Sequence, residues 1–225
     1  MRVFYFFTVI FLCNELLGQN FVENLTTASN VRLTVTNVGT FGNAFRGYKD
    51  GTGQPSGEFP AGSGTEHLFE SGIWIGGIDQ SGSIRVSTSA YDAPQGYAPG
   101  RGGFEFTNSI GGMEVTSSLT DNPNYSANSV SHQDFISNFS DENLLIPGTT
   151  IPISGHINPM GLGIKLSTYN WNYRFSDFFV IANLEIQNTG NQTYDDLHIG
   201  LWANTVVRNI NSTPAGSGGS NFYSQ

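Results

Sequence analysis

The sequence predicts an all-β protein, an antiparallel β-sandwich or jelly-roll-like fold with long Gly/Pro-rich loops and at most one short helix. Apolar and polar residues alternate over many short stretches, which is the two-residue period of half-buried strands. Between these stretches lie clusters of Gly, Asn and Ser, while Lys is scarce, a composition typical of strands joined by turns. A chain of 225 residues is long enough for one sizeable domain with its own core.

The first 18 residues are predicted to be a secretory signal peptide. Arg2 supplies the positive charge, residues 3–13 form an apolar run, and residues 16–18 resemble a cleavage site. The run is shorter than the roughly 20 residues that span a bilayer, so we expect no membrane span after the signal is removed. Residues 19–225 then form a single β-rich domain. Cys13, the one cysteine, leaves with the signal, so no disulfide is expected.

Charge and motif content exclude several classes of function. The net charge of -9 argues against a nucleic-acid partner or an anionic membrane surface. The sequence contains no nucleophile elbow, H-E-x-x-H helix, Walker loop or dinucleotide-binding glycine motif. We therefore predict that this chain is not an enzyme.

The first predicted strand is residues 30–37, where Val31, Leu33 and Val35 alternate with polar residues. Gly39 follows it as a turn residue. Residues 43–64 are crowded with Gly and Pro, which predicts a long loop or a loosely paired ribbon.

A hairpin is predicted next. Residues 68–78 and residues 83–89 both have a strand pattern, and the D-Q-S-G sequence of residues 79–82 suits a turn between them. Residues 90–103 are again rich in Gly and Pro and are expected to be a loop.

The middle of the chain gives weaker signals. Residues 104–107 and 113–116 are candidates for short strands. Ser131 and Asp134 have the spacing of a helix capping box, and apolar residues follow at helical spacing, so one short helix is expected near residues 131–139. Residues 164–173 are predicted to return to a strand.

The strongest pattern lies in residues 175–209. Its first half alternates apolar and polar residues as far as Ile186, and residues 188–192 have turn chemistry. Leu197, Ile199 and Leu201 then alternate in the same way. The two halves are predicted to pair as a hairpin. The remaining Gly/Ser-rich residues, 213–225, show no closing strand.

Four stretches together resemble a known family. NVRLTVTNVGTFG and PAGSGTEHLFESGIWIGG resemble the start of very large β-rich proteins that bacteria export by type IX secretion. NPMGLGIKLSTYNWNYRFSDFFVIANLEIQNTG and DDLHIGLWANTVVRN resemble a later region of the same proteins, with Asn204 where their pattern has an aspartate. The resemblance implies an N-terminal fragment, a domain truncated at its C-terminal end, and no assigned activity.

Carboxylates are the best candidates for a metal site. Asp177 precedes the first strand of the predicted hairpin, and Asp195 and Asp196 precede the second. Oxygen ligands suit Ca²⁺, which could staple a secreted β protein that has no disulfide. The alternative is ordinary turn chemistry, in which each Asp caps its own backbone. No cofactor other than this possible structural calcium is expected.

Aromatic residues offer a second candidate site. Trp171, Tyr169 and Tyr173 share one face of their predicted strand with Lys165. Aromatic faces stack on sugar rings, so the row could bind carbohydrate. Packing against a neighbouring sheet or domain is the alternative explanation.

These observations lead to one preferred function and two rivals. We expect a secreted or cell-surface module without catalysis, a structural or adhesive part of a larger exported protein. A carbohydrate-binding module of a polysaccharide-active protein is the first rival. A hydrolase whose catalytic domain lies downstream is the second. The expected partners are a cell-surface glycan or another surface protein.

Overall fold

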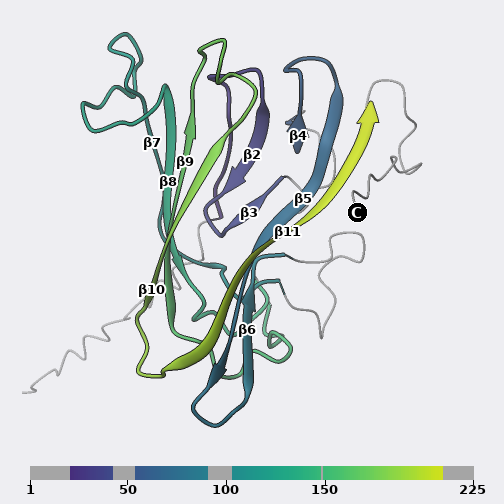
Figure 1. Ribbon diagram of the computed structural model, residues 1–225, viewed down its shortest axis with the longest axis vertical. Coiled ribbons are helices and arrows are strands. Elements are labelled where there is room, and N and C mark those ends of the chain that lie inside the picture. Colours follow the sequence, from purple (N-terminus) through teal and green to yellow (C-terminus); the bar gives the residue numbers. More distant parts are fainter. Residues whose placement is uncertain (1–20, 43–53, 91–102, 148, 210–225) are drawn as a thin grey trace, which may run out of the picture.

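Two antiparallel β-sheets face each other in the computed structural model (Figure 1). The structure describes residues 21–42, 54–90, 103–147 and 149–209, and the predicted signal peptide lies outside these ranges. Every regular element in the described residues is a strand, which confirms the all-β prediction and the β-sandwich. None of the described residues belongs to a helix that is long and apolar enough to cross a membrane.

The larger sheet is built around a long central strand, β5. Its order is β1-β2-β3-β5-β11, with β4 paired to β2 and β5, and β6 paired to β5. The turn from Asp79 leads β5 into β6, which confirms the predicted hairpin. The strands of this sheet are β1 (Glu23–Leu25), β2 (Arg32–Thr36), β3 (Thr40–Phe41), β4 (Gly57–Glu58), β5 (Thr65–Asp79), β6 (Ile84–Thr88) and β11 (Tyr194–Asn209).

The smaller sheet has the order β10-β9-β8-β7. Its strands are β7 (Asn108–Thr116), β8 (Gln133–Ser140), β9 (Leu162–Asn170) and β10 (Ile181–Asn188). The predicted strands at residues 113–116 and 164–173 correspond to β7 and β9. Residues 104–107, however, form a turn in which the Thr107 N–H donates to the carbonyl of Phe104, at 3.1 Å. The strand prediction there was wrong, because both phenylalanines of the turn are buried and mimic strand alternation.

The core lies between the sheets and is contributed by both. Ile73 and Ile75 of β5 are fully buried, and Phe139 of β8 packs edge-on against Phe106. Gly39 fits beneath this layer with a φ of +81°, and a Cβ there would lie 3.0 Å from both Ile73 and Phe139. The other buried members of the core are Val35, Phe41, Phe135, Met160, Leu162, Ile164 and Leu166.

The predicted helix near residues 131–139 is β8 instead. The Asp134 carboxylate does accept the Ser131 hydroxyl and backbone N–H, and also the N–H of Val130 at 2.6 Å. Because these donors precede Asp134 in the chain, the bonds close a turn before a strand and do not cap a following helix. Phe135, Ser137 and Phe139 are buried in alternation, the period of a strand.

The predicted hairpin of residues 175–209 was also wrong, although both of its strands exist. β10 pairs with β9 in the smaller sheet, whereas β11 pairs with β5 in the larger one. The chain therefore crosses between sheets at residues 189–193. Figure 1 shows β10 and β11 meeting at the lower end of the sandwich and diverging above it.

Candidate functional site

A polar pocket of about 270 Å³ lies where loops from both sheets meet. The segments after β1 and after β7 form two of its walls, and the start of β8 forms another. Most of its lining side chains are neutral donors and acceptors. They are Thr27, Thr116, Ser117, Asn122, Asn124, Gln133 and Asn172, joined by His132 and by Ala28, Val115 and Leu119.

Gln133 and His132 hold this pocket in shape. The Gln133 side-chain oxygen accepts the N–H groups of Thr27 at 2.7 Å and Ala28 at 3.3 Å, and its amide nitrogen donates to the Thr27 hydroxyl at 3.1 Å. Because Gln133 is on β8 and Thr27 follows β1, these bonds join the two sheets. His132 accepts the Asn172 N–H through Nδ1 at 3.1 Å, which fixes the loop after β9 against the pocket.

Two stacked aromatic rings lie beside the pocket. The Tyr173 ring is 4.6 Å from the ring of His132 and stacks on Phe175, with centroids 5.4 Å apart and an interplanar angle of 11°. Tyr173 is 49% exposed and Phe175 is 75% exposed. An exposed aromatic face next to amide and hydroxyl groups can both stack on a ring and hydrogen-bond its hydroxyls.

The structure divides the predicted aromatic row in two. β9 ends at Asn170, so only Tyr169 of the three lies on the strand. Trp171 neighbours Tyr169, with ring centroids 6.3 Å apart, and both are half-buried. Tyr173 belongs to the other group, with Phe175. Sequence reasoning missed Phe175 and the pocket, because the lining residues come from distant segments.

The three predicted calcium ligands are not brought together. Asp177 lies before β10, where its backbone carbonyl accepts the N–H of Asn30 at 2.8 Å. Asp195 and Asp196 lie beyond the far end of β10, and Asp195 pairs with Ile78. β10 has eight residues, and at about 3.3 Å per residue it separates the two groups by about 25 Å.

Asp196 lies at an irregular point of β11. Its φ of 47° places it at the irregularity of β11 between Asp195 and His198. Asp tolerates this left-handed backbone, so the residue suits a β-bulge. Among the described residues, no group of three or more His, Cys, Asp or Glu side chains could hold a metal ion.

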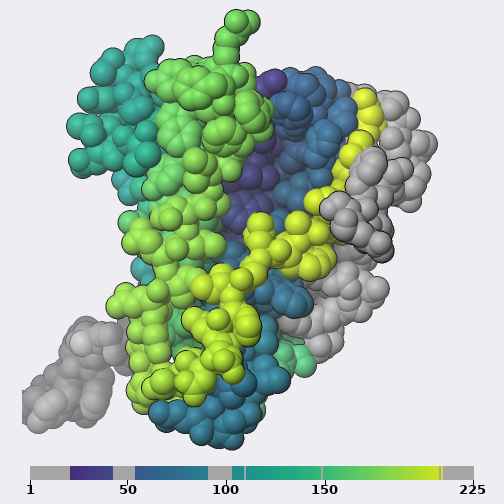
Figure 2. Space-filling view, in the orientation of Figure 1, coloured from purple at the N-terminus to yellow at the C-terminus, as the bar shows by residue number. Residues whose placement is uncertain are grey.

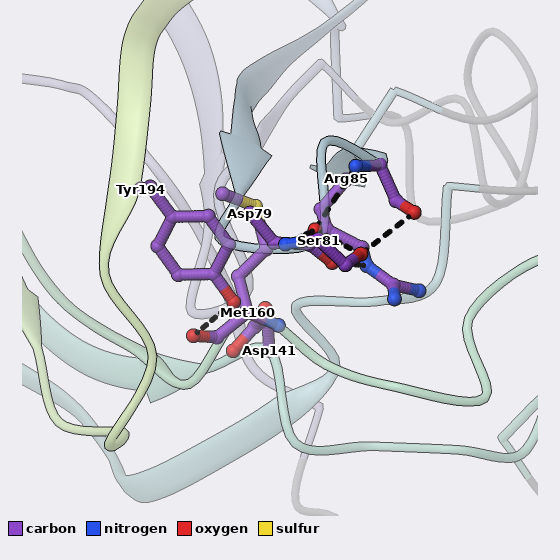
Figure 3. Close-up of polar contacts among 7 residues, drawn as sticks. Asp79, Ser81, Arg85, Asp141, Met160 and Tyr194 are labelled. Carbon is purple, nitrogen blue, oxygen red and sulfur yellow. Dashed lines mark hydrogen bonds and ion pairs between the residues drawn. The ribbon is translucent and has the colours of Figure 1, made fainter.

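The opposite end of the sandwich carries a second polar cluster, drawn in Figure 3. The Asp79 carboxylate accepts the Ser81 hydroxyl at 2.5 Å and the Arg85 Nε–H at 2.8 Å. These two bonds, with the backbone N–H of Ser83, hold the pKa of Asp79 well below its usual range. Asp79, Arg85 and Tyr194 border a hollow of about 470 Å³.

Asp141 lies behind that hollow and is fully buried. Its carboxylate accepts the Ser87 hydroxyl and the N–H groups of Met160 and Leu162, at 2.7, 2.8 and 2.7 Å. Ser87 is on β6 and Leu162 on β9, so this carboxylate joins the sheets. The Tyr194 hydroxyl donates to the Met160 carbonyl at 3.0 Å (Figure 3).

The pKa of one further carboxylate, that of Glu105, is shifted. Glu105 is 5% exposed, and burial raises its pKa from 4.5 to about 7, although the N–H of Gly103 donates to it at 2.6 Å. The negative charge of Asp141 adds a smaller rise. Glu105 lies in the turn before β7, away from the pocket beside Tyr173.

Comparison with known proteins gives no relative. No protein-family model, no curated protein and no solved structure matches the chain.

Proposed function

We propose that the chain is a non-catalytic structural or adhesive β-sandwich module of a secreted or cell-surface protein. One observation carries the proposal: the buried polar groups hold backbone and sheets in place. Asp141 and Gln133 each join one sheet to the other. Asp134 and Glu58 accept backbone N–H groups of neighbouring turns. In these positions the carboxylates and the amide hold the fold together, as a structural module requires.

The two buried histidines support the same conclusion. His156 is buried and its Nε2 lies 2.6 Å from the backbone carbonyl of Asp141. His132 is buried and accepts a backbone N–H. In the described contacts, neither imidazole ring hydrogen-bonds a side-chain hydroxyl, as a nucleophile–base pair would require.

Cells that produce the natural protein provide the test. We expect an antibody against this chain to label intact cells, and we expect cells lacking the chain to attach less well to surfaces. Labelling only after lysis would contradict the surface location. Turnover of a polysaccharide or peptide by the purified chain, abolished by a single folded variant such as Asp141→Asn, would contradict the non-catalytic role.

Carbohydrate binding is the second candidate, and the pocket beside Tyr173 favours it. Sugar hydroxyls need neutral donors and acceptors, which the amide and hydroxyl lining supplies, and an apolar ring face can stack on Tyr173 or Phe175. The ligand would be a neutral glycan, because the lining has no Asp, Glu, Lys or Arg.

A glycan array with the purified chain tests this candidate. For any neutral glycan that binds, Tyr173→Ala should weaken binding about tenfold through the lost stacking. Trp74→Ala is the matched control, because Trp74 is equally exposed, at 49%, but lies on the larger sheet. No binding, or equal losses in both variants, would remove the candidate.

A further inference from the structure

Ile199 and Leu201 of β11 are exposed, although the residues of β5 that pair with them are buried. Ile199 pairs with Ile75, and Leu201 pairs with Ile73. Directly paired residues of neighbouring strands point to the same face of a sheet, so Ile199 and Leu201 point to the core side. Ile73 and Ile75 are 0% exposed, whereas Ile199 is 55% and Leu201 is 62% exposed.

The same side of the smaller sheet is only partly covered. Leu184 and Ile186 of β10 pair with the buried Leu166 and Ile164, yet both remain half-buried. Figure 2 shows a hollow between the green strands of the smaller sheet and β11 in yellow. We call this hollow, which β10 and β11 border, the open seam; the side chains at issue are Leu184 and Ile186 on β10 and Ile199 and Leu201 on β11, which point to the core side of their sheets.

Both strands that border the open seam have one edge without a partner strand in the described residues. β10 pairs only with β9, and β11 only with β5. Between its two irregular regions, β11 keeps regular pairing from His198 to Asn204, a run of seven residues. Neither strand contains Lys or Pro, the residues that commonly protect edges from pairing.

The charges near the open seam select the kind of partner. Asp195 and Asp196 at the start of β11 are exposed, whereas Glu185 of β10 points to the outer face of its sheet and pairs with Lys165 at 3.1 Å. A second copy would bring the same acidic pair, whereas a segment that carries Lys or Arg at one end would complement it. Residues 210–225 are an unsuitable occupant because Gly, Ser and Pro replace alternating apolar residues.

We propose that the open seam binds an extended segment of another protein as an added β-strand on β11. The segment would supply about seven residues to match the regular run, with alternate apolar side chains covering Ile199 and Leu201. A Lys or Arg at the end that meets Asp195 and Asp196 would complement their charge. Such strand addition would serve a structural module and a glycan-binding module alike, so its test does not depend on the proposed function.

Fluorescence anisotropy of synthetic peptides with the full chain tests this proposal. The probe alternates Val and Thr over seven positions and carries Lys at both ends. One control peptide has the same composition with the valines consecutive, and another has Glu at both ends. We expect the alternating Lys-ended peptide to bind about tenfold more tightly than either control.

Two variants locate the site. Leu201→Lys places a charge under the added strand and should weaken peptide binding about tenfold or more. Val86→Lys is the matched control, because Val86 is 47% exposed on β6, away from β10, and it should bind normally. Thermal melting of both variants checks that they fold. Equal losses in the two folded variants would overturn the proposal.

Two other results would also overturn it. Absence of binding by every peptide would show that the full chain has no accessible edge. A dimer seen by sedimentation, dissociated by Leu201→Lys and not competed by peptide, would show that a second copy occupies the seam.

Discussion

Strands β9 and β11 have the same alternation of apolar residues, but these side chains are buried on β9 and exposed on β11. On β9, Leu162, Ile164 and Leu166 alternate with other residues and are only 1–3% exposed. On β11, Leu197, Ile199 and Leu201 have the same spacing and are 47–62% exposed. β9 pairs regularly with β8, and β11 pairs regularly with β5 from His198 to Asn204, so backbone pairing does not explain the exposure of Ile199 and Leu201.

The flanking strands and the facing sheet account for the difference in burial. β9 lies between β8 and β10, and the larger sheet covers its inward face. β11 is the outermost strand of its sheet, and β10 diverges from it above their connection (Figure 1). The comparison teaches that alternation identifies a strand and its faces, while burial depends on what the other sheet places opposite.

The largest expected effect lies on β9. Leu166→Ala should lower the free energy of unfolding by about 3 kcal/mol, because it removes a fully buried side chain and leaves a cavity. Urea unfolding, followed by intrinsic fluorescence, measures the change. If the free energy of unfolding fell by less than about 1 kcal/mol, burial on β9 would contribute less to stability than the exposed fractions indicate.

The buried part of the molecule should also respond to pH through Glu105. Its pKa is raised from 4.5 to about 7, so the folded state holds a proton that the unfolded state releases between these values. Stability from this group is therefore full below pH 4.5 and falls as the pH rises towards 7, by about 3 kcal/mol.

Urea unfolding at pH 5 and pH 8 tests this, with Glu105→Gln as the comparison. The variant should lose less stability than the natural chain between the two pH values. Asp79 acts in the opposite sense at lower pH. Its depressed pKa means that stability is lost as the pH falls below the usual 3.8. A natural chain equally stable at pH 5 and 8 would contradict the assignment to Glu105.

Asp141→Asn should have a smaller effect, about 2 kcal/mol. The amide keeps one oxygen for the donors of Ser87, Met160 and Leu162 but turns its NH₂ towards at least one of them. Chemical denaturation measures the loss. The conservative change Ser87→Ala removes one donor only and should cost less than Asp141→Asn.

The smallest effect is expected at the open seam. Leu201→Ala should change the free energy of unfolding by less than about 0.5 kcal/mol, because most of that side chain is in water. The same urea experiment compares it with Leu166→Ala. If Leu201→Ala lowered the free energy of unfolding as much as Leu166→Ala does, Leu201 would be covered in solution.

Two predictions were wrong because the local sequence pattern fits more than one structure. Ser131 and Asp134 have capping-box spacing, but their bonds close a turn before β8. Residues 104–107 place two buried phenylalanines at strand spacing in a turn. At the candidate site, Tyr173 was found from sequence as an aromatic residue, whereas Gln133 and its pocket neighbours lack any local signal because they meet only after folding.

By itself, the sequence determined where most strands lie and which of their side chains share a face, since alternation and turn chemistry are properties of neighbouring residues. Tertiary structure alone decided that β10 and β11 belong to different sheets, that Asp177 is far from Asp195, and that the leucines of β11 remain in water. Strand partners are chosen by contacts between residues distant in the chain, and a two-residue period carries no record of them.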